Sequence, residues 1–275
     1  MRRLLALITI LSTCVAGLSP LWADGASRLQ ALTTLDETKQ WQGVGRVNLG
    51  QRGFCTGTLI APEIVLTAAH CFFDKHSGER VRDRDIEFLA GLRSGRASAY
   101  RKVKRAILHP DYVYGSADKT ERVAADLALI ELDRPIRNSA IRPFATTLNA
   151  RLGQQVQVVS YALDRAEAPS IQKTCHVIGG RSGVYVTSCD VDFGASGAPV
   201  FVLEDGQPRV MSVVSAKAEW NSGKVAVAAG LKDRLDLLLE KLAQSDGVFR
   251  RSAVTPRKMS IGSARAETGA LFLKP

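Results

Sequence analysis

Short segments that alternate between apolar and polar or small residues recur along most of this sequence, with turn residues between them. The segments fall at residues 44–49, 55–60, 64–67, 86–89, 103–108, 127–132, 155–160, 184–187, 199–202 and 210–215. Short strands at regular intervals predict a β-sandwich or barrel. With 275 residues and 45% hydrophobic content, the chain can bury the core that such a fold needs. The sequence therefore predicts an all-β fold.

A helical pattern follows the last of these segments. Leucines recur at helical spacing over residues 231–244, at Leu231, Leu235, Leu238, Leu239 and Leu242. Residues 246–275 show no periodicity and are basic and rich in Ser, Ala and Gly. We predict a C-terminal amphipathic helix followed by a flexible basic tail.

Residues 1–23 have the layout of a secretory signal peptide. Residues 2–3 are both arginine, residues 4–15 are apolar, and Ala23 offers a small residue before a cleavage point. A membrane anchor is one alternative, although its apolar run is shorter than the roughly 20 residues that span a bilayer. A lipoprotein signal at Cys14 is a weaker alternative. We expect an exported protein.

Four cysteines follow the predicted signal peptide, and an even number in an exported protein indicates two disulfides. Pairing by nearness joins Cys55 to Cys71 and Cys175 to Cys189, and each bridge would stabilise the fold by about 3 kcal/mol. A zinc site is the competing use of these cysteines. However, no Cys-x2-Cys pair exists, and His176 beside Cys175 has poor ligand spacing. We expect no metal and no other cofactor.

Three separate motifs hold residues of the types that acyl transfer requires: His70 in TAAHC, Asp126 in DLALI and Ser196 in GASGAP. Singly, each has a structural interpretation, as a surface histidine, a strand cap and a tight turn. A serine nucleophile needs a nearby base to accept its proton. It also needs a carboxylate to orient that base and donors for the negative oxygen that forms. Together, the three motifs indicate nucleophilic catalysis.

These motifs resemble those of trypsin-like serine proteases of the chymotrypsin fold. The segment TAAHC matches the family's histidine motif, and Cys55 stands where the disulfide partner of its cysteine stands. Residues 109–112 (HPDY) resemble the stretch that often precedes the catalytic aspartate, DLAL matches the aspartate motif, and GASGAP matches the serine motif. The likeness covers roughly residues 40–245.

The resemblance implies two packed six-stranded antiparallel β-barrels, with the active site between them and a C-terminal helix. The first barrel is expected over residues 41–145, and the second barrel with the helix over residues 146–245. An N-terminal segment or propeptide would occupy residues 24–40, and the tail residues 246–275.

The resemblance also implies a role for each candidate residue. His70 would act as general base and then acid, Asp126 would orient it, and Ser196 would be the nucleophile. The backbone amides of Gly194 and Ser196 would form the oxyanion hole. The implied activity is endopeptidase hydrolysis of protein or peptide substrates through an acyl-enzyme.

Ala195 departs from the pattern of the family's animal members. They usually have an aspartate there, which pairs with the N-terminus created by zymogen cleavage, and they have an Ile-Val-Gly-Gly start that this chain lacks. Bacterial relatives, including the glutamyl endopeptidase-like group, lack this aspartate too and have a similar serine segment. The chain therefore looks closest to that branch, which would place it in the periplasm or the medium.

The resemblance assigns Asp190, Ser215 and Lys217 to substrate binding. Asp190 lies six residues before Ser196, the spacing of the aspartate that binds Arg or Lys in trypsin-like enzymes. Lys217 stands where the family's substrate-binding strand commonly has glycine. It could neutralise Asp190 or attract an acidic side chain. Basic, acidic and other specificities therefore all remain open.

The net charge of +10 raises nucleic acid and anionic surfaces as partners. The excess is concentrated in residues 79–105, with nine basic and four acidic residues, and in residues 246–275, with six and two. Neither segment holds a candidate catalytic residue, and no basic motif interleaved with aromatic residues indicates specific nucleic-acid binding. We expect a monomer that contacts an anionic envelope surface. The alternative function is a catalytically inert binding or adaptor protein on a protease fold.

Overall fold

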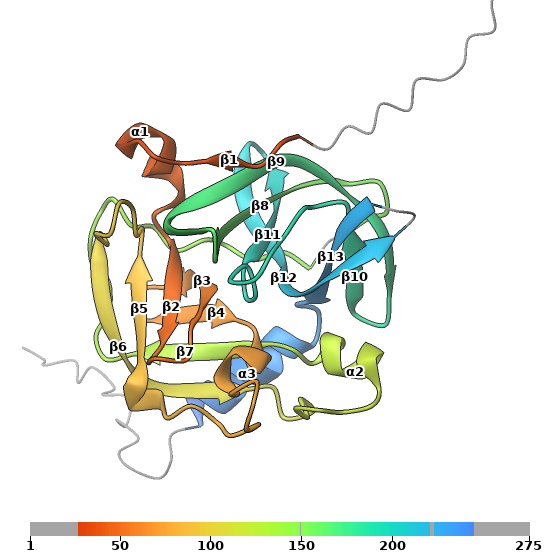
Figure 1. Ribbon diagram of the computed structural model, residues 1–275, viewed down its shortest axis with the longest axis horizontal. Helices are drawn as coiled ribbons and strands as arrows, with labels where there is room; N and C mark the ends of the chain where they lie inside the picture. The colour runs from red at the N-terminus through yellow and green to blue at the C-terminus, as the bar shows by residue number, and fades with distance from the viewer. Residues whose placement is uncertain (1–26, 149, 221–222, 245–275) are drawn as a thin grey trace, which may run out of the picture.

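The computed structural model describes residues 27–148, 150–220 and 223–244 (Figure 1). The predicted signal peptide and basic tail lie outside the described residues, so both stay predictions. None of the described helices is long and apolar enough to cross a membrane.

Six strands of the N-terminal half close into a barrel, in the order β2-β3-β4-β7-β6-β5. They are β2 (Val44–Leu49), β3 (Phe54–Ala61), β4 (Ile64–Thr67), β5 (Ile86–Ala90), β6 (Ala99–Leu108) and β7 (Ala128–Leu132). Alternate residues of a strand point to the same face. Fully buried side chains such as Val47, Leu59 and Val65 therefore build one apolar core.

The strands of the C-terminal half form a second sheet, in the order β1-β9-β10-β13-β12-β11-β8. They are β8 (Gln155–Ala162), β9 (Arg165–Arg181), β10 (Val184–Thr187), β11 (Pro199–Glu204), β12 (Gln207–Trp220) and β13 (Gly223–Gly230). Because β8 also pairs with β9, the six pairings return to their starting strand, and β1 (Gln30–Ala31) is added at the edge. The predicted all-β class with two six-stranded barrels is confirmed. The segment between β7 and β8 contains the predicted boundary near residue 145.

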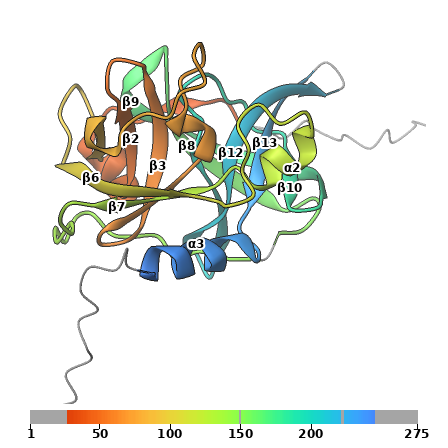
Figure 2. The same cartoon turned by 90° about the horizontal axis from the view of Figure 1, so that it is seen from below.

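The predicted C-terminal helix is present as α3 (Arg234–Ala243). It begins three residues later than predicted because Asp233 has φ +61°, a left-handed conformation that cannot continue into an α-helix. Its buried leucines pack toward the first barrel, beneath β6 and β7 (Figure 2). The end of the chain's second half is thus attached to the first barrel.

Aromatic side chains from three separate segments meet between the barrels. Trp41, which precedes β2, lies 5.2 Å from Phe201 of β11 between ring centroids. Phe144, in the segment between the barrels, lies 4.7 Å from Phe201 and 6.0 Å from Trp41. Tilted aromatic contacts at these distances are favourable. They make the two barrels one packed unit.

The described part of the predicted N-terminal segment is packed onto the second barrel. Strand β1 pairs with β9 at Ile171 and Ser170, and the Leu32 side chain is only 2% exposed. Helix α1 (Leu35–Thr38) then begins at a capping box between Thr34 and Glu37. Removing the segment would leave an open sheet edge and expose apolar surface.

We expect Leu32→Ala to lower the free energy of unfolding by about 2–4 kcal/mol, because it leaves a cavity in a packed core. The matched control is Leu35→Ala, three residues away and 59% exposed, which should change it by less than about 0.5 kcal/mol. Urea unfolding measures both. Equal effects would show that the segment contributes no burial to the folded chain.

Candidate active site

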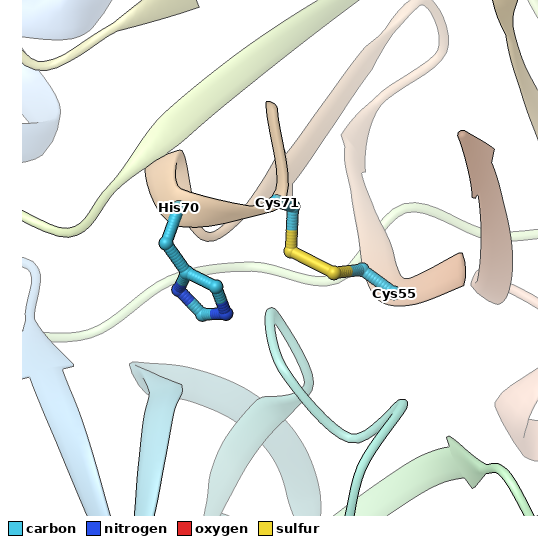
Figure 3. Close-up of side chains that lie close together, drawn as sticks. All are labelled: Cys55, His70 and Cys71. Atoms are coloured by element: carbon cyan, nitrogen blue, oxygen red, sulfur yellow. A yellow bond between two sulfur atoms is a disulfide. The ribbon is translucent and has the colours of Figure 1, made fainter. Parts of the chain in front are cut away.

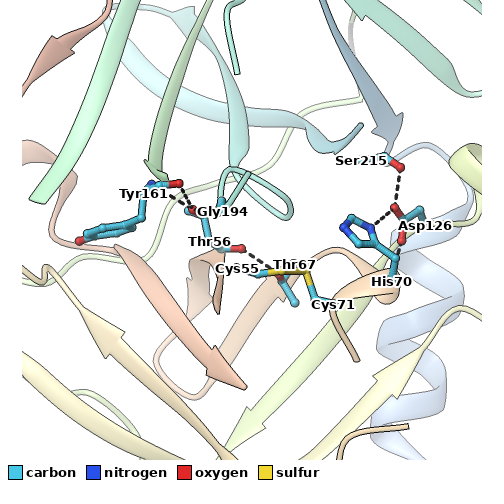
Figure 4. Close-up of a disulfide and its surroundings, with 9 residues drawn as sticks. All are labelled: Cys55, Thr56, Thr67, His70, Cys71, Asp126, Tyr161, Gly194 and Ser215. Atoms are coloured by element: carbon cyan, nitrogen blue, oxygen red, sulfur yellow. Dashed lines mark hydrogen bonds and ion pairs between the residues drawn. A yellow bond between two sulfur atoms is a disulfide. The ribbon is translucent and has the colours of Figure 1, made fainter. Parts of the chain in front are cut away.

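His70 and Asp126 come from the ends of two paired strands. His70 lies in a short 3-10 helix (Ala69–Phe72) directly after β4, and Asp126 lies just before β7. Strand β4 pairs with β7 up to Thr67 and Ala128, so the two residues emerge side by side. The ring Nδ1 lies 2.6 Å from Asp126 Oδ2, and the His70 amide donates to Oδ1 at 2.8 Å (Figure 4). The carboxylate therefore holds the imidazole by Nδ1 and leaves Nε2 for another partner.

Ser215 makes a third contact with this carboxylate. Its hydroxyl, on β12 of the second barrel, donates to Asp126 Oδ2 at 2.5 Å. Strand β12 pairs with β13 through Val214 and Ala216 and skips Ser215, so a bulge re-aims the side chain. The Ser215 side chain therefore orients Asp126, and the substrate-binding role expected for Ser215 stays a prediction.

The protonated form of His70 is favoured in this setting. Burial acts to lower the pKa of His70, but the charge of Asp126 and the hydrogen bond to it outweigh burial and leave this pKa raised. Lys75 and Arg122 act in the opposite direction through their positive charge. The pair can therefore stabilise the imidazolium that forms when the ring accepts a proton.

Thr56 on β3 holds the turn that carries Ser196. Its amide donates to the Ser196 carbonyl at 2.8 Å, and its hydroxyl donates to the Gly194 carbonyl at 2.9 Å. The Tyr161 amide donates to the same hydroxyl oxygen at 3.0 Å (Figure 4). Sequence reasoning missed Thr56, since a threonine in a strand carries no signal for contacts 140 positions away.

Gly197 brings this turn against the segment that leads to His70. At φ +79°, a Cβ on Gly197 would lie 2.1 Å from Thr67 Oγ1 and 2.3 Å from the Thr56 carbonyl oxygen. Only a glycine therefore allows the approach. Among the described residues, no hydrogen bond joins the Ser196 hydroxyl to His70. Such catalytic hydrogen bonds often tighten only when substrate is bound.

The peptide groups around Ser196 leave two amides available. The Phe193 carbonyl accepts from the Leu163 amide at 2.8 Å, and the Gly194 carbonyl accepts from Thr56. Within the described chain, no hydrogen bond uses the amides of Gly194 or Ser196. Two oriented backbone donors beside a serine are what an oxyanion hole needs.

Two ion pairs occupy the predicted specificity region. Lys217 Nζ lies 2.7 Å from Asp192 Oδ1 and 3.9 Å from the centroid of the Phe193 ring. Asp190 instead pairs with Lys224 of β13, at 3.4 Å. The expected alternative in which Lys217 neutralises Asp190 is therefore wrong, because Asp192 takes the Lys217 ammonium.

Cys55, His70 and Cys71 offer ligand atoms within 4.8 Å of one another, a spacing that could suit a metal ion. However, the two sulfurs are bonded to each other at 2.03 Å (Figure 3). A disulfide offers no thiolate, so this cluster does not have the donors of a cysteine metal site. The second predicted pairing, Cys175 with Cys189, is also present, so both predicted disulfides are confirmed.

The first barrel carries a histidine–aspartate pair, and the second carries a serine in a turn of small residues. Two antiparallel barrels with this arrangement are typical of chymotrypsin-like serine proteases. The family model described as Trypsin matches residues 34–237. The chain belongs to the trypsin family.

Known relatives point to the same class. Glutamyl endopeptidase from Bacillus licheniformis is 27% identical over 150 residues, which cover 54% of this chain and 45% of that protein. Snake venom serine protease Dav-KN from Deinagkistrodon acutus is 29% identical over 145 residues, covering 52% and 45%. The chain thus spans less than half the length of these relatives. A solved structure of a Glu endopeptidase in complex with MPD is 19% identical and superposes with a TM-score of 0.64 over 80% of this chain and 99% of that one, which shows the shared fold.

We expect Gly197→Ala to destabilise the protein by several kcal/mol more than Gly206→Ala. Both glycines have positive φ, +79° and +73°, so both substitutions carry the same conformational cost of about 1–2 kcal/mol. A Cβ on Gly206 meets nothing within 4 Å, whereas one on Gly197 collides with Thr67 and Thr56. The difference between the two variants in thermal unfolding isolates the destabilisation caused by the collision. Equal stabilities would contradict the close approach of the turn to the first barrel.

Proposed function

We propose that this protein is a secreted serine endopeptidase that cleaves peptide bonds through an acyl-enzyme on Ser196. The observation that carries the proposal is the His70–Asp126 pair, held by two hydrogen bonds, next to a serine turn that Thr56 holds by two more. This combination supplies a base, an orienting carboxylate and a half-buried nucleophile within one site.

In the proposed reaction, Ser196 Oγ attacks the substrate carbonyl carbon while His70 Nε2 takes the hydroxyl proton. The carbonyl oxygen becomes negative and accepts hydrogen bonds from the amides of Gly194 and Ser196. Collapse of this intermediate breaks the C–N bond, and Nε2 returns its proton to the departing amine. Water then attacks the ester in the same way, which releases the acid and restores the serine hydroxyl.

The proposal includes export from the cell. Two disulfides support it, because such bonds persist in oxidising compartments and are rare where thiols are kept reduced. The similarity of this chain to the glutamyl endopeptidase-like branch is consistent with bacterial secretion into the periplasm or the medium.

Contact with an anionic envelope surface stays a prediction. Four carboxylates, Asp83, Asp85, Glu87 and Glu131, pair with five of the nine basic residues in segment 79–105, because two basic residues share Glu131. Glu131 lies outside the segment, so it alone lowers the local excess of positive charge below what the segment's composition indicates.

We expect a fluorophosphonate probe to label the wild-type protein at one site and to leave Ser196→Ala unlabelled. Ser188→Ala is the matched control and should label normally, since the Ser188 hydroxyl accepts from the His176 amide and has no hydrogen bond to residues 193–197 among the described residues. Gel fluorescence with peptide mapping locates the adduct. Labelling that persists in Ser196→Ala would overturn the assignment. A folded wild-type protein that neither labels nor cleaves peptides would favour the inert adaptor.

We expect Asp126→Asn to lower kcat by roughly four orders of magnitude and to lower the pKa of His70. The wild-type pKa is raised by Asp126, while burial, Lys75 and Arg122 act to lower it and remain in the variant. Activity rises with pH as the ring becomes neutral, so the acidic limb of kcat/KM should move to lower pH. Asp111→Asn, which removes a carboxylate that is 67% exposed, should leave the limb in place.

NMR titration of the His70 imidazole measures the pKa directly in both variants. An unchanged pKa in Asp126→Asn would contradict the electrostatic role assigned to this carboxylate.

A further inference from the structure

A cavity of about 340 Å³ adjoins the His70 imidazole and the β12 segment at Ser215 and Ala216. Its other described lining residues belong to the first barrel and lie between Tyr112 and Asp126 in the sequence. The cavity therefore opens beside the proposed catalytic pair, on the side of the segment that precedes Asp126.

Arg122 is the one permanent cation among the described residues that line this cavity. It lies on α2 (Lys119–Ala124), and its Nη1 donates to the Ser116 carbonyl at 3.1 Å. No carboxylate of the described chain lies within ion-pair distance of it. The nearby acids are engaged elsewhere. Asp126, which also lines the cavity, is held by His70 and Ser215. Asp118 caps α2, and Glu121 pairs with Arg234 at 3.8 Å. The guanidinium is half-buried with donors to spare.

Tyr112 supplies a neutral donor to the same cavity. Burial raises the pKa of its hydroxyl, so the group stays protonated at any physiological pH. No hydrogen bond between described residues uses this hydroxyl. The cavity thus combines a guanidinium that has no ion pair among the described residues with a hydroxyl that none of them uses, a donor set that suits a carboxylate.

The geometry of a bound peptide decides which of its residues reaches this cavity. An extended substrate would add along β12 at residues 215–217, as peptides do at exposed strands. The residue whose carbonyl is attacked (P1) would direct its side chain toward Asp190 and Asp192. Successive side chains of a strand alternate in direction. The preceding residue (P2) would therefore direct its side chain toward His70 and the cavity.

We propose that Arg122 makes this cavity a subsite selective for an acidic side chain at P2. The inference rests on the proposed endopeptidase function, because the substrate's position follows from attack by Ser196. It concerns the residue before the cleaved bond and is independent of which P1 side chain the Asp190 region accepts.

The test uses pairs of peptides that differ only in Glu or Gln at P2, with P1 set to the residue preferred in cleavage profiling. We expect wild-type protein to favour Glu by roughly tenfold or more in kcat/KM, since a charge-assisted hydrogen bond is worth about that much. Arg122→Gln should bring the ratio to about one, and Arg122→Lys should keep part of the preference. Moving the Glu to P3 should abolish it, because that side chain points the other way.

Arg137→Gln is the matched control. Arg137 is exposed and has no ion pair among the described residues, so the variant removes the same charge without touching the cavity. It should keep the wild-type preference. Circular dichroism of Arg122→Gln and Arg122→Lys checks that both variants fold. A wild-type ratio near one, or a preference that survives in Arg122→Gln, would overturn the inference.

Labelling by a small fluorophosphonate separates the two proposals, since this probe has no P2 residue. Labelling at Ser196 without discrimination at P2 would overturn the Arg122 subsite alone. If the wild-type protein does not label, the endopeptidase function fails. Fluorescence anisotropy then measures the Kd of the same peptides for the Ser196→Ala variant and so tests the Arg122 subsite without cleavage. A Kd that favours Glu roughly tenfold and depends on Arg122 would support it, and equal Kd values would overturn it.

Discussion

The two hydrogen bonds that Thr56 donates to the Ser196 turn are the contact on which the rest of the site depends. The preceding residue, Cys55, is bonded to Cys71, which directly follows His70 in the chain. Two consecutive residues of β3 therefore connect the segment of the proposed base with the turn of the proposed nucleophile. Gly197, which follows Ser196, lies against Thr67 in the segment that leads to His70 and so adds a second connection between the two segments. A site divided between two barrels is thus held together by a short stretch of one strand.

Charge pairing determines what the site offers to a substrate. The Asp190 carboxylate, which the sequence offers as an anchor for a basic side chain, pairs with a lysine of the same barrel, and so does Asp192. Arg122 lines the cavity beside His70 and has no ion-pair partner in the described chain. Because Asp126 is held by His70 and Ser215, Arg122 is the charged group of this cavity that has no ion pair in the described chain. Under the proposal, this arrangement favours an acidic over a basic side chain at P2.

The sequence predicts the strands with clear alternation, the disulfides and the three candidate catalytic motifs, because each is local in the chain or follows from nearness. It does not reveal β9, which contains Pro169 and two consecutive glycines, or β13, whose small residues obscure the alternation. Contacts between distant segments are equally hidden. The Ser215 hydroxyl contacts Asp126, 89 positions away, because a bulge in β12 turns its side chain. Lys217 pairs with Asp192 because the fold brings β12 beside the segment that precedes Ser196.

In the proposed function, the His70–Asp126 pair turns Ser196 into a nucleophile that becomes acylated. Rapid-quench reaction of the mature protein with a chromogenic ester, followed by intact mass measurement and peptide mapping, tests it most directly. The account predicts a burst of leaving group equal to the amount of protein and a mass increase of one acyl group, located on Ser196. Turnover of the ester without an adduct, or with an adduct on another residue, would contradict it.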